Sequence, residues 1–413
     1  DCSSSMENSE LQRWTTCGAF VDLNSDGITD LIAANYCVTD QHPDQPCPNS
    51  EGELGTCHPL RFRAAKNRVF VGTAEGRFED RTSVWMPSES PGRTMGLLAG
   101  TLAGQTIVDR AKNFGREVNV LMANDMSPNQ FTNLDDDDGR LVETGVSRGL
   151  AVDGRNLPQA SMGIAASDFD NDGDLDIFMT GFAGEHDVYY EQATNGFWVD
   201  SSVKVGVVNP TLAMVGFGTE AIDLDGDGID EIAVTNGHIA KFPDDIYDFE
   251  QPFQLFRRGE KGTFTLVEDD SWGRYFSNDH VGRALWTIDV NADNRSDIMV
   301  THIQEPVHLL INGTSDNNRR IGFKLVGTSC SRDAIGAVVR FEVDRKTRKL
   351  WSLSGHGYMC SNEQVLRAGV GHSEWVRNVT VEWSDGSTDR VGDLETDAQY
   401  VLVQGEPKAT KVK

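Results

Sequence analysis

The chain has 413 residues, a hydrophobic fraction of 38% and a formal net charge of −27. A chain of this length and apolar content can bury one large core and a smaller one, which excludes a disordered protein. The acidic charge excludes nucleic acid as a default partner, and because no run of about 18 apolar residues occurs, we expect no membrane insertion.

Five of the seven cysteines fall into two groups along the chain. Cys37, Cys47 and Cys57 bracket an insertion rich in Pro, Gly and Asn, which predicts a loop stapled by a disulfide. Cys330 and Cys360 stand apart near the C-terminus, where we expect them to pair with each other. Disulfides favour a secreted, extracellular or periplasmic protein, and the alternative is a set of buried free thiols.

Four acidic segments share the pattern D-x-[DN]-x-D-[GN]-x-x-[DE], each followed by a short apolar run. They cover residues 22–30, 168–176, 223–231 and 289–297. A decayed copy without its acids lies in the long interval between the first two. Residues 93–100 match the lead-in to the second segment, and residues 119–125 match the strand that follows it. We therefore expect five repeat units, of which the second binds no metal.

Three of the acidic segments are followed by two short strand patterns around a Gly turn, at 67–80, 188–200 and 254–266. A unit of about 50 to 60 residues with about four strands is typical of a propeller blade. Single copies cannot bury their faces and must pack side by side. The sequence predicts an all-β fold, with a β-propeller of five recognisable blade units (at most seven blades) over residues 1–312 and a small β domain over 319–405.

The acidic segments have the ligand chemistry of a calcium site. Ca²⁺ takes several oxygen ligands at about 2.3–2.6 Å, and side chains at positions 1, 3 and 5 of a tight loop converge on one point. Position 7 offers a backbone carbonyl, and the carboxylate at position 9 closes the site. Position 6 requires a left-handed backbone, which suits Gly27, Gly173, Gly228 and also Asn294. We expect about four Ca²⁺ ions.

Two other interpretations of these segments compete with this one. An EF-hand loop requires a Glu at position 12 and a following helix, whereas position 12 here lies in an apolar β-type run: Ala33, Met179, Val234 and Val300. The second alternative is an Asp-rich turn without a metal. Four carboxylates within nine residues would repel one another strongly in the absence of a cation, which favours the calcium site.

The segment at 168–176 resembles the FG-GAP/VCBS repeat, whose blades occur in integrin α-chain propellers and many bacterial secreted proteins. Residues 321–328, 332–339, 354–361, 369–371 and 379–386 resemble the ASPIC/UnbV domain, which accompanies such repeats in the cartilage acidic protein-like family. By the family's pattern, the side-chain ligands would be Asp22, Asn24, Asp26, Asp30, Asp168, Asp170, Asp172, Asp176, Asp223, Asp225, Asp227, Glu231, Asp289, Asn291, Asp293 and Asp297. The backbone ligands at position 7 would be Ile28, Asp174, Ile229 and Arg295.

Histidines are the only candidates for catalytic groups that the sequence offers. The chain has no motif of the common hydrolases, phosphate-binding loops or dinucleotide-binding folds. His238 and His302 follow blade strands, and His280 lies near the next lead-in, so the three can converge on the ring axis as acid–base or metal groups. The alternative is that each histidine binds a turn of the backbone and is purely structural.

The leading functional hypothesis is an extracellular binding or scaffolding module. Calcium would hold the blade loops rigid, and one propeller face would bind an unknown protein, glycan or small-molecule ligand. The first alternative is an enzyme of the lyase or cyclase type that uses the central cleft of the propeller. The second is a carbohydrate-binding lectin, which should carry an aromatic and a polar residue that recur at the same position in each blade. The tryptophans recur at no single blade position, which argues against a lectin.

Overall fold

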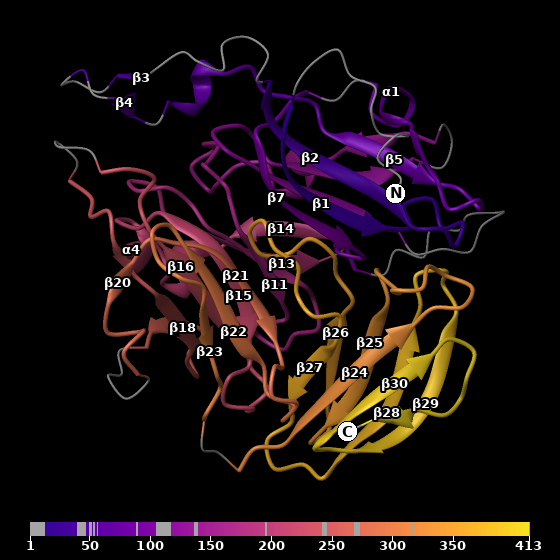
Figure 1. Cartoon of the computed structure of the whole chain (residues 1–413). Helices are drawn as coiled ribbons and strands as arrows, with labels where there is room; N and C mark the ends of the chain where they lie inside the picture. The colour runs from indigo at the N-terminus through magenta and orange to yellow at the C-terminus, as the bar shows by residue number, and fades with distance from the viewer. Residues whose placement is uncertain are drawn as a thin grey trace.

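The computed structural model describes residues 13–38, 47–48, 52, 54–55, 57–87, 90–104, 117–135, 139–194, 196–241, 246–267, 273–314 and 317–412. Strands dominate these residues, and the helices are single turns (Figure 1). They are α1 (Thr82–Trp85), α2 (Gly145–Arg148), α3 (Ser202–Val205) and α4 (Val208–Thr211), with a 3-10 turn at Pro59–Arg61. Within the described residues, no helix has the length and apolar character needed to span a membrane.

Five antiparallel sheets follow one another along the described chain and form the blades of a β-propeller, which confirms the predicted fold class. Blade 1 contains β1 (Arg13–Val21), β2 (Asp30–Val38), β5 (Arg68–Gly72) and β6 (Phe78–Asp80). Blade 2 contains β7 (Thr94–Gly100), β8 (Asn119–Asn124), β9 (Gln130–Leu134) and β10 (Leu141–Glu143). Blade 3 contains β11 (Ile164–Ser167), β12 (Asp176–Met179), β13 (Val188–Thr194) and β14 (Phe197–Asp200).

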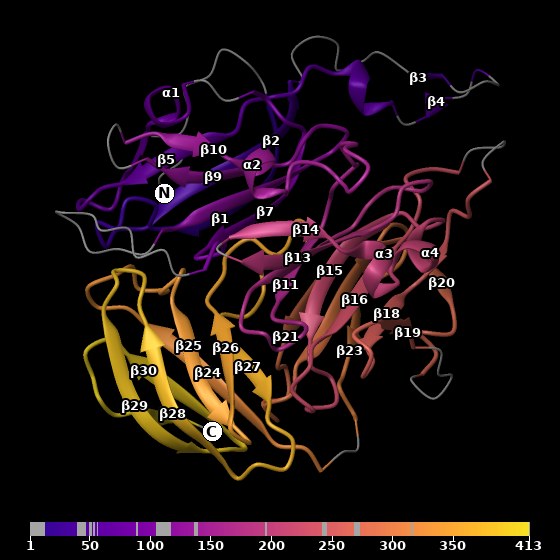
Figure 2. The same ribbon diagram turned by 180° about the vertical axis from the view of Figure 1, so that it is seen from behind.

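In the last two blades the strands again lie side by side in chain order, and Figure 2 shows the outer strands of both blades. Blade 4 contains β15 (Gly216–Ile222), β16 (Glu231–Asn236), β18 (Gln254–Arg258) and β19 (Phe264–Leu266). Blade 5 contains β21 (Gly282–Ile288), β22 (Asp297–His302) and β23 (His308–Leu310). Two short ladders lie outside the blades, β3 (Cys47–Pro48) with β4 (Leu54–Gly55) and β17 (Gln251–Pro252) with β20 (Asp279–His280).

The hydrophobic cores of the propeller lie between neighbouring blades. Leu98 of blade 2 and Ile177 of blade 3 belong to one buried cluster, and Phe178 of blade 3 packs against Phe256 of blade 4 with ring centroids 6.5 Å apart. Because successive residues of a strand point to opposite faces, each blade presents apolar side chains to both neighbours. The blades therefore stabilise one another, as the repeat pattern predicts.

The C-terminal domain consists of two sheets that enclose their own core. The first sheet contains β24 (Arg320–Val326), β27 (Leu366–Gly369), β30 (Ala398–Val403) and β31 (Thr410–Lys411). The second contains β25 (Val338–Val343), β26 (Lys346–Trp351), β28 (Trp375–Glu382) and β29 (Thr388–Glu395). Phe323, Phe341 and Trp383 are fully buried between them. Since β31 pairs with β30, the first sheet continues beyond residue 405.

The connection between β26 and β27 leaves this domain and enters the propeller, as the gold segment near β1 and β21 in Figure 1 shows. We call residues 352–363 the axis loop. Ser354 forms a two-way backbone bridge with Ala99 of β7, and Gly357 forms another with Ile164 of β11. The axis loop thus adds to the innermost strands of blades 2 and 3 in the manner of an extra strand.

The axis loop also connects the first and last blades of the row. The innermost strands contact each other in the order β1, β7, β11, β15, β21, whereas β21 and β1 have no comparable contact among the described elements. The Cys360 thiol lies 3.2 Å from the Leu285 carbonyl of β21, and a Cβ on Gly355 would lie 3.3 Å from the methyl group of Ala19 on β1. The C-terminal domain therefore supplies part of the central packing of the ring.

The cysteines pair only partly as expected. Cys47 and Cys57 form a disulfide, which confirms the predicted staple of the insertion, whereas Cys37 is a buried free thiol. The expected bond between Cys330 and Cys360 is wrong, because both thiols are free. Cys330 lies in the core of the C-terminal domain, whereas the axis loop carries Cys360 away to blade 5.

Candidate functional site

The four acidic segments form the hairpin connections between the first and second strands of blades 1, 3, 4 and 5. We call them acidic loops 1 (22–30), 2 (168–176), 3 (223–231) and 4 (289–297). All four share one backbone conformation, with left-handed residues at positions 4 and 6. The φ angles at position 6 are 86° for Gly27, 93° for Gly173, 86° for Gly228 and 67° for Asn294. The predicted left-handed position is confirmed, including its occupation by Asn in acidic loop 4.

A repeated set of hydrogen bonds holds each acidic loop in this shape. In acidic loop 2, the backbone N–H groups of Asp172 and Gly173 each donate to the carboxylate of Asp168, both at 2.9 Å. The N–H of Asp174 donates to Asp172 Oδ1 at 2.9 Å. Equivalent bonds from position 6 to position 1 and from position 7 to position 5 occur in the other three acidic loops. The ligand positions are thus preorganised by the backbone.

The side chains at positions 1, 3 and 5 gather as the calcium interpretation requires. Ligand oxygens of Asp168, Asp170 and Asp172 all lie within 4.8 Å of one another, and the same holds for positions 1, 3 and 5 of acidic loop 3. In acidic loops 1 and 4, position 3 is an Asn whose amide lies within hydrogen-bond distance of the Asp at position 5. Carboxylate and amide oxygens are the ligands that Ca²⁺ prefers.

The carboxylates at position 9 lie at the base of each acidic loop. Asp30 accepts the N–H of Leu23 and the N–H of Gly72, both at 2.9 Å, and thereby ties acidic loop 1 to the third strand of its blade. Asp176, Glu231 and Asp297 accept the N–H of position 2 or of the third-strand region in the same way. Each carboxylate oxygen has two lone pairs, so these bonds leave a ligand position available. Sequence reasoning missed this second role.

Burial raises the pKa values of several carboxyl groups in the acidic loops, and a bound cation would stabilise their charged forms. Burial, with the neighbouring Asp172, raises the pKa of Asp168 to about 7, and burial raises the pKa of Asp176 to about 8. Burial likewise raises the pKa of Asp22 to about 6 and that of Asp30 to about 7. Grouped carboxylates that lose their hydration are stabilised in the charged form by a bound metal ion. The residues present therefore fit a divalent cation.

The C-terminal domain contacts all four acidic loops. The Lys349 ammonium donates to the carbonyl of Gly173 in acidic loop 2, and the N–H of Gly369 donates to Asp223 Oδ2 in acidic loop 3 at 3.0 Å. In acidic loop 4, the Asn294 amide donates to the carbonyl of Ala398 at 3.4 Å. In acidic loop 1, a Cβ on Gly27 would lie 2.8 Å from the carbonyl of Ser329. The candidate metal sites thus lie at the interface between the two domains.

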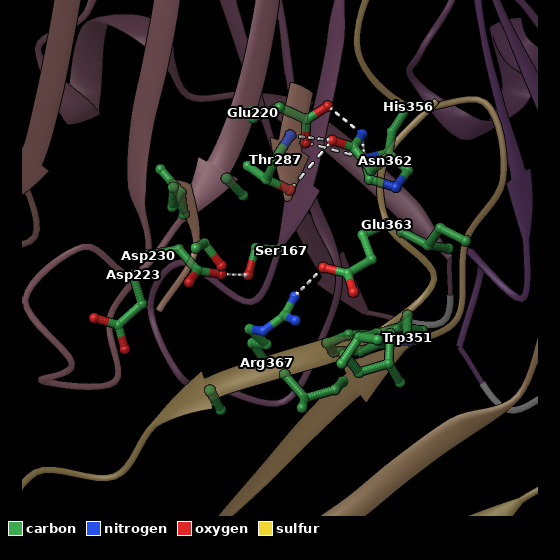
Figure 3. A pocket seen from close by; sticks show the side chains of 18 of the residues that line it. Ser167, Glu220, Asp223, Asp230, Thr287, Trp351, His356, Asn362, Glu363 and Arg367 are labelled. Atoms are coloured by element: carbon green, nitrogen blue, oxygen red, sulfur yellow. Dashed lines mark hydrogen bonds and ion pairs between the residues drawn. The ribbon is translucent and has the colours of Figure 1, made fainter. Parts of the chain in front are cut away.

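A polar cavity of about 140 Å³ lies beside this interface, between the innermost strands of blades 3 to 5 and the C-terminal domain (Figure 3). His356 of the axis loop contacts Glu220 of β15 at 3.0 Å, and Asn362 donates to the same carboxylate at 2.6 Å. On the other side, Arg367 binds Glu363 at 2.9 Å. Ligand pockets usually measure about 300–1,000 Å³, so this cavity is too small for a drug-sized molecule.

The pair of His356 and Glu220 predicts a pH dependence of stability. Burial alone lowers the pKa of His356, but the charge of Glu220 and their hydrogen bond together raise it above the usual 6.5. The contribution of the pair is therefore fully present below pH 6.5 and is lost as the pH rises through the elevated pKa. We expect His356→Gln to destabilise the protein most at about pH 6 and least at about pH 9, as measured by urea unfolding.

The control for this experiment is His372→Gln, which removes an exposed imidazole of the C-terminal domain that contacts a backbone carbonyl. It should destabilise the protein equally at both pH values. A constant effect of His356→Gln across the same pH range would contradict the assignment of a charged His356.

The candidate catalytic histidines separate into two places. His280 of β20, His302 of β22 and His308 of β23 lie together, with ligand nitrogens within 4.8 Å of one another. His238 lies apart and its Nδ1 contacts the carbonyl of Ala240 at 3.0 Å. The structure therefore brings together two of the three predicted histidines and adds His308. They gather at blade 5, where β22 and β23 supply His302 and His308 and the neighbouring β20 supplies His280.

Comparison with known proteins agrees with this architecture. Residues 168–234 match the model of the FG-GAP-like repeat, and residues 327–409 match the model described as ASPIC and UnbV. The chain is thus a β-propeller that contains an FG-GAP-like repeat at residues 168–234, followed by a region at residues 327–409 that matches the ASPIC and UnbV model. The resemblance predicted from the sequence is confirmed.

The chain is similar to cartilage acidic protein 1 of two mammals. It is 27% identical to the Mus musculus protein over 382 residues, which cover 89% of this chain and 51% of the relative. It is 26% identical to the Homo sapiens protein over 258 residues, which cover 60% of this chain and 36% of the relative. The chain thus spans about half the length of the mouse relative and a smaller part of the human one.

Among solved structures, the Dos1 propeller matches at a TM-score of 0.31 and 9% identity. The match covers 97% of this chain and 93% of that chain.

Proposed function

We propose that this protein is a secreted, calcium-binding propeller that acts as a binding or scaffolding module, with calcium holding the C-terminal domain against the blades. The observation that carries the proposal is the position of the four acidic loops. They share one preorganised conformation, and each one contacts the C-terminal domain. Ions held there would stabilise a domain interface, which is a structural role.

The arrangement of the ring axis favours binding over catalysis in a central cleft. The axis loop crosses the innermost strands. Beside it lie a small polar cavity next to the C-terminal domain and an open hollow of about 600 Å³, which is lined by Arg283, Trp286 and residues 358–361. A partner would therefore bind the surface of the propeller that faces away from the C-terminal domain. The disulfide between Cys47 and Cys57, together with similarity to relatives named cartilage acidic protein 1, supports secretion.

Two substitutions in acidic loop 2 test calcium binding directly. Asp168→Ala removes the position-1 carboxylate, whereas Asp174→Ala changes position 7, where the backbone carbonyl is the expected ligand. We expect metal analysis to find four Ca²⁺ per chain in the unaltered protein and after Asp174→Ala, but three after Asp168→Ala. Equal calcium content in the two variants would contradict the ligand assignment. Fewer than three ions in the unaltered protein would contradict the proposal itself.

The binding role is tested by surface plasmon resonance of the whole chain against panels of neutral glycans and extracellular matrix proteins. We expect saturable binding to one of these probes, which weakens after calcium is chelated and returns when Ca²⁺ is added. The absence of binding to either panel, together with turnover of a glycan by the purified protein, would favour the enzyme alternative instead.

A further inference from the structure

We propose that His280, His302 and His308 form a binding site for one divalent transition-metal ion of the Zn²⁺ and Cu²⁺ class. This site is separate from the four acidic loops. Neutral imidazole nitrogens suit these ions, whereas Ca²⁺ requires oxygen ligands. The three histidines come from three elements of the blade 5 region, and one ring nitrogen of each lies within 4.8 Å of those of the other two.

The spacing of the three rings fits a tetrahedral ion. Their centroids are 5.2 Å apart for His280 and His302, 5.6 Å for His280 and His308, and 4.8 Å for His302 and His308. An ion about 2 Å from each nitrogen would hold the ring centres about 5 Å apart in tetrahedral geometry. The rings meet at 50° to 89°, so they are not stacked on one another. Only small side-chain adjustments are needed to close the site.

Neighbouring groups orient two of the imidazoles toward a metal. His302 Nδ1 lies 3.2 Å from the carbonyl of Pro306, and His280 Nδ1 lies 2.9 Å from a carboxylate oxygen of Glu305. Metal-binding histidines usually donate one N–H to a carbonyl or a carboxylate, which fixes the other nitrogen as the ligand. Here the remaining nitrogen is Nε2 in both residues, and in His280 a bound ion would displace the Nε2 proton that faces the Tyr275 carbonyl. Glu305 and Pro306 are thus positioning residues for this site.

Tyr275 satisfies these two ligand nitrogens in the absence of an ion. Its hydroxyl lies 3.0 Å from His302 Nε2, and its backbone carbonyl lies 3.0 Å from His280 Nε2. Its ring stacks on His280 with centroids 4.3 Å apart. A bound ion would replace two hydrogen bonds with three coordinate bonds. The tyrosine hydroxyl would remain beside the fourth position, which three protein ligands leave open.

The histidine site is accessible from solvent and lies far from the acidic loops. His302 ends β22, and acidic loop 4 ends at the other end of that strand, at Asp297. The strand places the two about 17 Å apart. His280 is buried, whereas His302 and His308 are partly exposed. A cation can therefore reach the site from the propeller face opposite the C-terminal domain.

The test uses the whole chain, stripped of metal and reloaded with saturating Ca²⁺, and then titrated with Co²⁺ and with Zn²⁺. We expect one equivalent of Co²⁺ to give the intense visible absorption of a tetrahedral site, and one equivalent of Zn²⁺ to displace it. His302→Gln and His308→Gln should each weaken Zn²⁺ binding at least about 100-fold. Glu305→Gln should weaken it by about 10- to 100-fold, because it removes an orienting carboxylate.

His372→Gln, which removes an exposed histidine of the C-terminal domain, is the matched control and should leave Zn²⁺ affinity unchanged. Thermal melting in Ca²⁺ verifies that each variant is folded. Failure of the unaltered protein to give the tetrahedral cobalt spectrum would overturn the proposal. Retention of full Zn²⁺ affinity by folded His302→Gln and His308→Gln variants would do the same, and would leave the cluster as packing around Tyr275.

Discussion

Chelation of calcium will lower the thermal midpoint of this protein by more than about 10 °C. A ligand that binds only the folded state stabilises it by about 2.7 kcal/mol when its concentration is 100 times the dissociation constant. Four such sites contribute about 11 kcal/mol. With an unfolding entropy of about 2.1 cal/mol/K per residue, each kcal/mol shifts the midpoint of a 413-residue chain by a little over about 1 °C. Differential scanning calorimetry before and after addition of a chelator measures the effect.

Addition of Ca²⁺ alone, in a zinc-free buffer, should restore the midpoint and thereby assign the effect to the acidic loops. Limited proteolysis gives a second readout of the same change. Because every acidic loop contacts the C-terminal domain, chelation should speed cleavage in both domains and not only at the loops. A midpoint that moves by less than about 2 °C would identify the acidic loops as Asp-rich turns without a metal.

The conformation of the acidic loops could be predicted because it depends on local sequence. Gly27, Gly173 and Gly228 are left-handed, and Asn294 adopts the same conformation because its short polar side chain tolerates it. The blades could be predicted for a similar reason, since strand and turn patterns recur at a fixed period. The acidic side chains gather around one point because of the conformation of the loop itself, so this arrangement could be predicted without the rest of the fold.

The axis loop could not be predicted, because its partners lie far away in the sequence. Ser354 pairs with Ala99 and Gly357 pairs with Ile164, and no local pattern specifies these bridges. The same loop carries Cys360 away from Cys330, which is why the expected disulfide fails. His308 was missed for a related reason. His308 lies near His302 because β22 and β23 pair as antiparallel neighbours, and no sequence motif marks the position of His308.

The axis loop should be highly sensitive to added volume, and Gly355→Ala tests this directly. Gly355 has a φ of 86°, and a Cβ there would lie 2.8 Å from the Leu97 carbonyl of β7 and 3.3 Å from the methyl group of Ala19 on β1. Backbone on one side and a buried strand on the other leave little room to adjust. We expect Gly355→Ala to lower the free energy of unfolding by about 2–5 kcal/mol, the sum of about 1–2 kcal/mol of left-handed strain and about 1–3 kcal/mol of overpacking.

Gly405→Ala separates these two contributions. Gly405 has a φ of 80°, but nothing lies within 4 Å of the position that its Cβ would occupy. It should therefore show the strain alone, about 1–2 kcal/mol in urea unfolding with Ca²⁺ present. If Gly355→Ala lowers the free energy of unfolding by no more than Gly405→Ala, the axis loop is loosely held. The C-terminal domain would then be a neighbour of the propeller and not part of its centre. A larger loss at Gly355 alone means that the ring depends on a segment supplied by the other domain.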